Sequence, residues 1–450
     1  MASFSIRNFG CRVNQAEAFD WAEELQRRGL RLEPDAARGD VVIVNSCTLT
    51  GRADRDVRKL VRKVLRENPA ARVVVTGCLA ERDPGEFERW PGVWKVVANA
   101  EKAGLPDLIA LDAERGPEAA ADTAARPLRA RAMLKVQDGC GCACRFCVIP
   151  SVRGKSASVP LDAVVERARV LAARGFGEIV LTGIHLCSYG RDLAPRRSLA
   201  ELLTELDALP GRFRVRLSSL DPRLMPETLV DRLVASPRIC PHFHLSLQHA
   251  SAGVLRAMGR DSAPEDYRRL LAALYGRAPE AALGADVIVG FPGETEADFR
   301  ELEDFLEEEP LAYFHVFAYS PRPGTAAEGD GAVPQGGVAC AVGATNAMPQ
   351  GGTACGGTAT MAVPARIKAG RAARLRRLSG EKWAGYLAKF IGRELEGIVV
   401  RAGVREAEIL TPNYIDVRAS GERSVRGSTV RVRIDGVEGG AASGTIVFRV

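Results

Sequence analysis

The chain has 450 residues, with 62 lysines and arginines against 56 aspartates and glutamates, and a formal net charge of +6. This length exceeds one ordinary hydrophobic core, so two or three domains are expected. No stretch approaches the roughly 20 apolar residues of a membrane span, and the N-terminus lacks the pattern of a secretory signal. We therefore expect a cytoplasmic protein with no membrane partner. The 11 cysteines do not fit a small secreted disulfide scaffold, and clustered thiols in a reducing cytosol favour metal binding or catalysis.

The first part of the chain alternates strand and helix patterns. Strands are predicted over 3–9, 40–44 and 72–75, and helices over 14–28 and 52–66, the first of which stops at Gly29. This alternation predicts a parallel sheet with flanking helices, and we assign residues 1–112 to this α/β domain. Residues 113–130, rich in Ala, Arg and Glu, are expected to form a linker.

A second α/β series follows over residues 131–325. Its strands are predicted at 133–137, 178–181, 214–217, 242–247, 285–289 and 313–318. Six strands with helices between them indicate a barrel-like domain, which periodicity alone leaves either open or closed.

The last third of the chain changes composition twice. Residues 326–363 are rich in Gly, Ala, Thr and Pro and almost uncharged, which predicts a flexible insertion. Residues 364–393 form a basic amphipathic helical connector, and short β runs with Gly turns over 394–450 predict a small β-barrel.

The strongest chemical signal is a loop with three closely spaced cysteines after the first strand of the second series. Cys140, Cys144 and Cys147 occur in QDGCGCACRFCVIP. Three thiolates on one loop can hold three irons of a [4Fe–4S] cluster, which normally takes four, so one iron stays open for another ligand. The alternative is a zinc knuckle, which needs a fourth ligand; no His lies in the loop, and Cys142 would make a cramped set.

This spacing, with Phe146 before the last cysteine, resembles the radical S-adenosylmethionine superfamily. The resemblance implies a partial (β/α)6 barrel in which the open iron binds the amino and carboxylate groups of S-adenosylmethionine. Residues after the other strands are expected to face the same mouth and contact this cofactor. Together with Phe146 they are Thr182, Gly183, His185, Ser218, Ser219, Gln248, Gly290 and Glu294. Each of these could instead be a turn or helix-cap residue, and Gly293-Glu294-Thr295 also suits a helix start.

The N-terminal domain has a dispersed second set of cysteines. Cys11, Cys47 and Cys78 each follow one of its first three predicted major strands. Because the carboxyl ends of parallel strands meet at one sheet edge, the three thiols are expected to converge. The alternative is that they are buried structural cysteines.

These segments, joined to the radical domain and a terminal β-barrel, resemble the methylthiotransferase family over nearly the whole chain. The resemblance implies a second [4Fe–4S] cluster on Cys11, Cys47 and Cys78 that carries the sulfur to be inserted. GCRVNQ, NSCTLT with the following Ala53-Asp54, and TPNYI at 411–415 resemble the branch that modifies N6-threonylcarbamoyladenosine in tRNA. The barrel would then be a TRAM-like RNA-binding domain.

The chemistry that the resemblance implies explains the lack of a hydrolytic signature. C2 of adenine bears an unactivated hydrogen, which a 5′-deoxyadenosyl radical can abstract, and a second S-adenosylmethionine supplies the methyl group. A flavodoxin- or ferredoxin-like electron donor is implied, and the sulfur donor is not identified by the sequence. The five histidines, at 185, 242, 244, 249 and 315, are expected mainly to pack or form hydrogen bonds.

Two basic stretches are candidates for contacts with tRNA phosphates. They contain Arg52, Arg55, Arg58, Lys59, Arg62 and Lys63, and Arg366, Lys368, Arg371, Arg374, Arg376 and Arg377. Either set could also be a solvated helix face. The rival functions are methylthiolation of isopentenyladenosine in tRNA, methylthiolation of a ribosomal-protein aspartate, and a non-catalytic zinc or RNA-binding protein.

Overall fold

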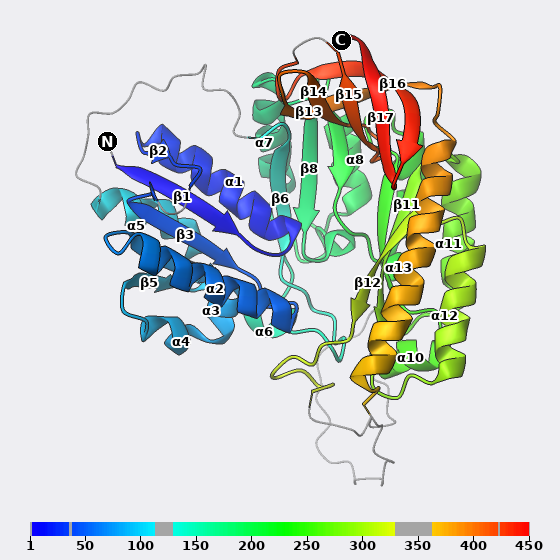
Figure 1. Ribbon diagram of the computed structural model, residues 1–450, viewed down its shortest axis with the longest axis horizontal. Coiled ribbons are helices and arrows are strands. Elements are labelled where there is room, and N and C mark those ends of the chain that lie inside the picture. Colours follow the sequence, from blue (N-terminus) through cyan, green and yellow to red (C-terminus); the bar gives the residue numbers. More distant parts are fainter. Residues whose placement is uncertain (1, 36–37, 113–128, 329–361, 422–423, 450) are drawn as a thin grey trace. The chain divides into compact units, whose positions relative to one another are not determined.

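The computed structural model describes residues 2–35, 38–112, 129–328, 362–421 and 424–449 (Figure 1). The chain divides into two compact units, residues 1–141 with 148–218 and residues 142–147 with 219–450. Most of the linker expected over 113–130 and most of the insertion expected over 326–363, with Cys340 and Cys355, lie outside the described residues. Within the described part of the chain, no helix has the length and apolarity needed to cross a bilayer.

The first unit begins with a five-stranded parallel sheet in the order β2-β1-β3-β4-β5. Its strands are β1 (Ser3–Asn8), β2 (Arg31–Leu32), β3 (Val41–Ser46), β4 (Arg72–Gly77) and β5 (Val93–Val97). The runs VVIVNS and VVVTG are buried throughout, as expected for central strands covered on both faces. The flanking helices are α1 (Arg12–Arg27), α2 (Gly51–Glu67), α3 (Cys78–Arg82), α4 (Pro84–Glu88) and α5 (Leu105–Asp112).

The first unit also contains a second sheet, with the strand order β7-β6-β8-β9. It consists of β6 (Ala132–Asp138), β7 (Ala157–Ser158), β8 (Glu178–Gly183) and β9 (Arg214–Leu217), with helices α6 (Ile149–Arg153), α7 (Leu161–Ala173) and α8 (Leu199–Asp207). Strands β6, β8 and β9 are parallel, and the short β7 pairs antiparallel with β6.

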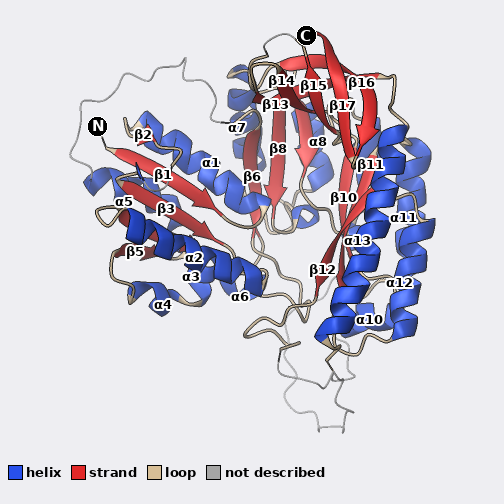
Figure 2. Ribbon diagram, in the orientation of Figure 1, coloured by secondary structure: helices blue, strands red, loops and turns tan. Residues whose placement is uncertain are grey.

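The second unit contains the parallel sheet β10-β11-β12. Its strands are β10 (His242–Gln248), β11 (Ala282–Val289) and β12 (Tyr313–Ala318), and its helices are α9 (Glu227–Ala235), α10 (Ala252–Ala257), α11 (Pro264–Arg277), α12 (Glu296–Glu308) and α13 (Ala365–Ala388). Figure 2 shows α11, α12 and α13 along one side of this sheet. Helix α12 starts with a capping box, in which Thr295 and Asp298 each satisfy a backbone N–H of the other.

The end of the second unit is a closed barrel in the order β13-β14-β15-β17-β16. Its strands are β13 (Glu394–Ala402), β14 (Glu406–Leu410), β15 (Asp416–Ser420), β16 (Thr429–Glu438) and β17 (Ala441–Arg449). Buried and exposed residues alternate along β15 and the first part of β16, as in a strand with one face in a core.

The predicted fold class is confirmed. The parallel N-terminal sheet, the six strands predicted for the second α/β series and the small terminal barrel all occur in the predicted order. Three strands were missed: β2 and β7 have only two residues each, and β5 (VWKVV) is mostly half-buried.

Candidate active site

The N-terminal cysteine trio lies at one edge of the first sheet. Cys11 precedes α1, Cys47 follows β3, and Cys78 is the first residue of α3 directly after β4. The register pairs Asn8 with Asn45 and Ser46 with Gly77, so the carboxyl ends of the three strands are aligned. The three cysteines carry free thiols.

Two glycines allow the close approach of these cysteine-bearing turns. Gly10 has φ +93°, and a Cβ there would lie 2.6 Å from both Cβ and Sγ of Cys47. Gly77 has φ +95°, and a Cβ there would lie 2.3 Å from the Ser46 carbonyl oxygen. Both positions combine a left-handed backbone with a contact that leaves no room for a side chain. Gly10, before Cys11, and Gly77, before Cys78, thus allow these two turns to lie in close contact with the turn that carries Cys47.

The surroundings of the trio fit a metal ligand set. Burial and, to a smaller extent, the charges of Cys11 and Cys78 raise the pKa of the Cys47 thiol to about 12. Burial also raises the pKa of Cys11. Thiols with a raised pKa are stabilised as thiolates when they bind a cation, because metal binding displaces their protons.

Arg153, the last residue of helix α6 in the same unit, contacts Cys78 of this trio. Its Nε donates to Sγ of Cys78 over 3.3 Å, and its side chain is 1% exposed. Its other nitrogens donate to Asn14 and to the carboxylates of Glu17 and Asp138. A buried guanidinium with this many acceptors is fixed in position, and it places a positive charge beside a thiol.

Arg153 belongs to a network of five charged side chains, in which those of Arg153, Glu17 and Lys102 are buried and two others are partly exposed. Glu17 also receives Lys102 Nζ at 2.8 Å and Lys135 Nζ at 3.4 Å, and Lys135 contacts Asp138 at 3.1 Å. The three cations and two carboxylates leave a net positive charge next to the trio. These cations hold the pKa of Glu17 far below its usual range despite its burial.

Asn14 ties the backbone of the first two cysteine turns together. Its Nδ2 donates to the carbonyl oxygens of Phe9 and Ser46, each at 2.9 Å, while its Oδ1 accepts from Arg153 and from the thiol of Cys11. Asn14 and Glu17 are buried positions on α1. A carboxylate on the apolar face of a predicted helix was the sequence signal for this network, and it was missed.

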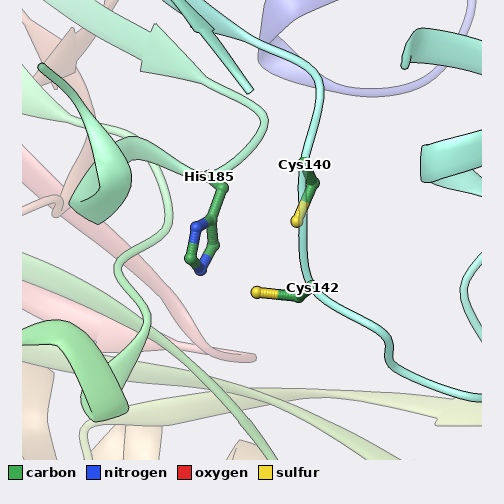
Figure 3. Close-up of side chains that lie close together, drawn as sticks. All are labelled: Cys140, Cys142 and His185. Carbon is green, nitrogen blue, oxygen red and sulfur yellow. The ribbon is translucent and has the colours of Figure 1, made fainter. Parts of the chain in front are cut away.

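The Cys140 end of the three-cysteine loop is anchored in the first unit. The Cys140 N–H donates to the Gly154 carbonyl at 3.0 Å, and a Cβ on Gly139 would lie 2.0 Å from the Lys155 carbonyl oxygen. The segment 153–155 therefore contacts Cys78 through the Arg153 side chain and the start of the loop through its backbone. The Cys140 thiol lies within 4.8 Å of a ring nitrogen of His185 (Figure 3). An imidazole next to a thiol also suits zinc, so this detail alone does not separate the two metal chemistries.

The other end of the loop, residues 142–147, groups with the second unit. The Cys147 N–H donates to the Cys144 carbonyl at 3.1 Å, which places both cysteines on one tight turn. Arg260 and Arg223 lower the pKa of Cys144, whereas burial, the larger effect, raises it. Phe146 packs against Phe291 with a ring-centroid distance of 6.4 Å.

Four of the expected cofactor residues lie at the carboxyl ends of β8 and β9 in the first unit. Thr182 is fully buried, and its hydroxyl donates to the Leu134 carbonyl. The Gly183 N–H donates to Ser218 Oγ at 3.3 Å, and the His185 N–H donates to Gln137 Oε1 at 2.8 Å. Gly183 thus contacts Ser218, and His185 contacts Gln137, a residue that the sequence did not single out.

The remaining cofactor residues lie in the second unit. Ser219 is exposed, and Gln248 ends β10 with φ +73°, a left-handed conformation that is uncommon for a residue other than glycine. Gly290 follows β11 with φ +74°, and the stem of Lys368 fills the space where its Cβ would be.

Glu294 has both carboxylate oxygens occupied by protein partners. Oε2 accepts from the N–H groups of Gly290 and Phe291 at 2.6 and 3.1 Å, and Oε1 contacts Arg371 of α13 at 2.6 Å. Burial nevertheless raises the pKa of this carboxyl. This arrangement favours a role for Glu294 in holding the turn that follows β11.

Comparison with known proteins shows to which class of enzyme the chain belongs. Residues 134–306 match the model of the Radical SAM superfamily, and residues 3–98 match that of the Uncharacterized protein family UPF0004. The fold resembles the radical S-adenosylmethionine methyltransferase TsrM of Kitasatospora setae, with a TM-score of 0.54 at 16% identity over 73% of this chain and 77% of that one. At this identity the likeness concerns the fold alone. The chain is a radical S-adenosylmethionine enzyme, and this class implies a [4Fe–4S] cluster and S-adenosylmethionine.

Proteins of similar sequence show to which family within this class the chain belongs. The chain is 34% identical to the threonylcarbamoyladenosine tRNA methylthiotransferase MtaB of Aquifex aeolicus (strain VF5), over 96% of this chain and 99% of the relative. It is 36% identical to the ribosomal protein uS12 methylthiotransferase RimO of Roseiflexus sp. (strain RS-1), over 72% and 76%. The chain therefore belongs to the radical S-adenosylmethionine methylthiotransferase family, as its motifs predicted.

Proposed function

We propose that this enzyme adds a methylthio group to C2 of N6-threonylcarbamoyladenosine in tRNA. The observation that carries the proposal is the convergence of Cys11, Cys47 and Cys78 in a radical enzyme whose similarity to an MtaB protein runs through nearly the whole chain, terminal barrel included. Further MtaB proteins of other bacteria match at 34–36% identity, and this repeated similarity favours a tRNA substrate over a ribosomal protein.

A second [4Fe–4S] cluster on the N-terminal trio is part of the proposal. The aligned strand ends, the glycines at 10 and 77 and the Arg153 donor on Cys78 all suit a buried cluster with one open iron. The first cluster would be held by Cys140, Cys144 and Cys147. S-adenosylmethionine would be bound near Phe146, Thr182, Gly183, His185, Ser218, Ser219, Gln248 and Gly290, with Glu294 holding the turn.

The protein itself contributes position and electrostatics. When bound, the clusters and S-adenosylmethionine supply the radical that removes the C2 hydrogen and the sulfur and methyl groups that replace it. The ion network of Arg153, Glu17, Lys102, Lys135 and Asp138 would provide a fixed net positive charge beside thiolates. Fixed charge of this kind needs no reorganisation during reaction.

We assign tRNA binding to exposed basic residues and to the terminal barrel. On α2, Arg55 and Lys59 are exposed, whereas Arg58 is paired with Glu86 at 2.7 Å. On α13, Arg371 is buried against Glu294 and Arg374 contacts Glu303, so much of that basic stretch holds the helix in place. An electron donor of the flavodoxin or ferredoxin type completes the set of partners.

Nucleoside analysis tests this function. Purified protein, reconstituted without oxygen, is incubated with S-adenosylmethionine, a reductant, sulfide and one of three substrates: tRNA with threonylcarbamoyladenosine, tRNA with isopentenyladenosine, or ribosomal protein uS12. Mass spectrometry should find the methylthio group on the first substrate, and about eight irons per chain are expected. A product on either other substrate instead would assign the enzyme to that branch.

The cysteine variants test the second cluster separately. A variant with Cys11, Cys47 and Cys78 replaced by Ala should keep about four irons and still cleave S-adenosylmethionine to 5′-deoxyadenosine, but insert no sulfur. Replacement of Cys140, Cys144 and Cys147 should abolish cleavage. Unchanged sulfur insertion in the first variant would refute a second cluster on these residues.

A further inference from the structure

Three side chains with metal-binding groups converge on the sheet of the second unit, outside the sites described above. His244 of β10, Asp286 of β11 and His315 of β12 place their ligand atoms within 4.8 Å of one another. Asp286 is paired in register with His315, and His244 is paired with Gly284, two residues before Asp286. Because alternate residues of a strand share a face, all three side chains project from the same face of the sheet.

The distances within this set are close to those of a ligand shell. Nε2 of His244 lies 2.9 Å from Oδ1 of Asp286, and the rings of His244 and His315 are 5.3 Å apart between centroids. His244 is buried, Asp286 is partly buried and His315 is exposed. The set is therefore anchored in the sheet on one side and reachable from solvent on the other.

A second layer of contacts orients the buried histidine. Nδ1 of His244 lies 3.1 Å from the hydroxyl of Tyr313, which in turn lies 2.8 Å from Nε2 of His242. Gly284 makes room for this tyrosine, since a Cβ there would lie 2.4 Å from Cζ of Tyr313. Metal-binding histidines commonly use their second nitrogen in a hydrogen bond of this kind, which directs the first nitrogen to the metal.

We propose that His244, Asp286 and His315 form a binding site for a divalent first-row transition metal. Nε2 of His244, a carboxylate oxygen of Asp286 and a ring nitrogen of His315 are the ligands. Two imidazoles and one carboxylate suit Zn²⁺ or Fe²⁺ and are poor ligands for the thiolate-preferring Cu⁺. Three protein ligands leave at least one coordination position for water or another small ligand. This site is separate from the cysteines that would hold the two clusters.

Zinc is the probe, because it can be measured independently of cluster iron. The full chain, with both clusters reconstituted anaerobically, is equilibrated with Zn²⁺ and a competing chelator, desalted and analysed for zinc and iron. One zinc per chain is expected in addition to the cluster iron. X-ray absorption at the zinc edge should show only nitrogen and oxygen neighbours near 2.0–2.1 Å, without the sulfur distance of about 2.3 Å.

Variants distinguish this site from zinc bound by stray thiols. His244→Ala with His315→Ala, and separately the near-isosteric Asp286→Asn, should lose the bound zinc while keeping full cluster iron and far-ultraviolet circular dichroism. Phe317→Ala, at an exposed position two residues from His315 on the same strand face, is the matched control and should keep a zinc with the same nitrogen and oxygen shell. The proposal is overturned if no zinc is retained, if sulfur neighbours appear, or if the ligand variants bind zinc like the unmodified protein.

Discussion

At the scale of single residues, the candidate cluster site depends on two glycines that precede ligand cysteines. At position 10 a methyl group would overlap Cβ and Sγ of Cys47, and the backbone has a positive φ. A glycine such as Gly175 shares the positive φ, at +84°, but has nothing within 4 Å of its Cβ position. Alanine variants at these two positions therefore distinguish a steric clash with Cys47 from strain of the backbone alone.

Gly10→Ala should therefore abolish iron binding at the N-terminal trio, because the Cys11 turn can no longer approach Cys47. Reconstituted iron should fall from about eight to about four per chain. Gly175→Ala should keep its iron and lose only about 1–2 kcal/mol of stability, the cost of a left-handed conformation for alanine. Equal loss of iron in both variants would show that strain, not the contact with Cys47, matters.

Arg153 is the residue whose position connects most of the candidate site. It donates to Cys78, to the buried carboxylate of Glu17 and to the partly exposed carboxylate of Asp138 at once. Lys135 contacts the same carboxylates, and no thiol contact is described for it. Arg153→Met removes one cation and also the donor to the thiol. Lys135→Met removes one cation from the same network and leaves that donor in place.

Arg153→Met should lower the reduction potential of the N-terminal cluster more than Lys135→Met does. A hydrogen bond and a positive charge at a cluster thiolate favour the reduced state, so losing both disfavours reduction. Electron paramagnetic resonance during a redox titration measures the two midpoint potentials. Equal shifts would contradict a specific role of the contact with Cys78.

At the scale of secondary-structure elements, strands β8 and β9 are joined by a fully buried ion pair. Arg216 Nε lies 2.7 Å from Oε1 of Glu178, and Arg131 adds a contact to the same carboxylate at 3.1 Å. The two arginines lower the pKa of Glu178 from 4.5 to about 2 against the opposing effect of burial. The folded state therefore stabilises the ionised form of Glu178 more than the unfolded state does.

Glu178→Gln should destabilise the protein by about 3–5 kcal/mol at neutral pH, because it leaves a buried guanidinium without its counter-ion. The folded-state pKa is depressed, so the stabilisation is complete above about pH 4.5 and is lost as the pH falls towards 2. The difference between wild type and variant, measured by urea unfolding of cluster-free protein, should shrink over this range. Glu166→Gln, at an exposed helix position, should show no such trend.

Helix α2 combines an apolar face with exposed cations that have no ion partner among those described. Val57, Val61 and Val64 are buried, while Arg55 and Lys59 face solvent. Arg55→Ala with Lys59→Ala should weaken tRNA binding and reduce the dependence of log Kd on log salt by up to about two phosphate contacts. Fluorescence anisotropy at several salt concentrations measures both. Arg256→Ala with Lys389→Ala, at exposed positions of the second unit, should leave the salt dependence unchanged.

At the scale of the whole molecule, the terminal barrel shares its core with the second unit. Barrel residues such as Ile409 and Val417 belong to one buried cluster with Tyr386 and Leu387 of α13 and Tyr313 of β12. The barrel is thus not an independent appendage within this unit. The unit should unfold as a whole when the shared core is weakened.

Ile409→Ala should destabilise the second unit by about 2–5 kcal/mol through lost burial and a cavity. Hydrogen exchange detected by mass spectrometry should show faster exchange in β10–β12 peptides as well as in the barrel. Val180→Ala, in the buried strand β8 of the first unit, should leave second-unit exchange unchanged. Faster exchange confined to the barrel in Ile409→Ala would show that it unfolds alone.

Local sequence patterns were enough to predict the main strands and helices in order, the fold class and the cysteines at the strand ends. Apolar periodicity is local, and parallel strands bring their carboxyl ends to one edge, so the position of Cys11, Cys47 and Cys78 followed from strand assignment alone. The family motifs added the predicted cofactor residues in the same way, from short segments such as QDGCGCACRFC and VIVGFPGE.

Only the tertiary structure decided which distant side chains meet. Arg153 lies 75 positions from Cys78, and Lys102 lies 85 positions from Glu17, with no local pattern to link them. The same holds for His244, Asp286 and His315, which come together through strand register. Side-chain contacts across a core depend on how whole elements pack, and sequence periodicity specifies the buried face of an element but not its partner.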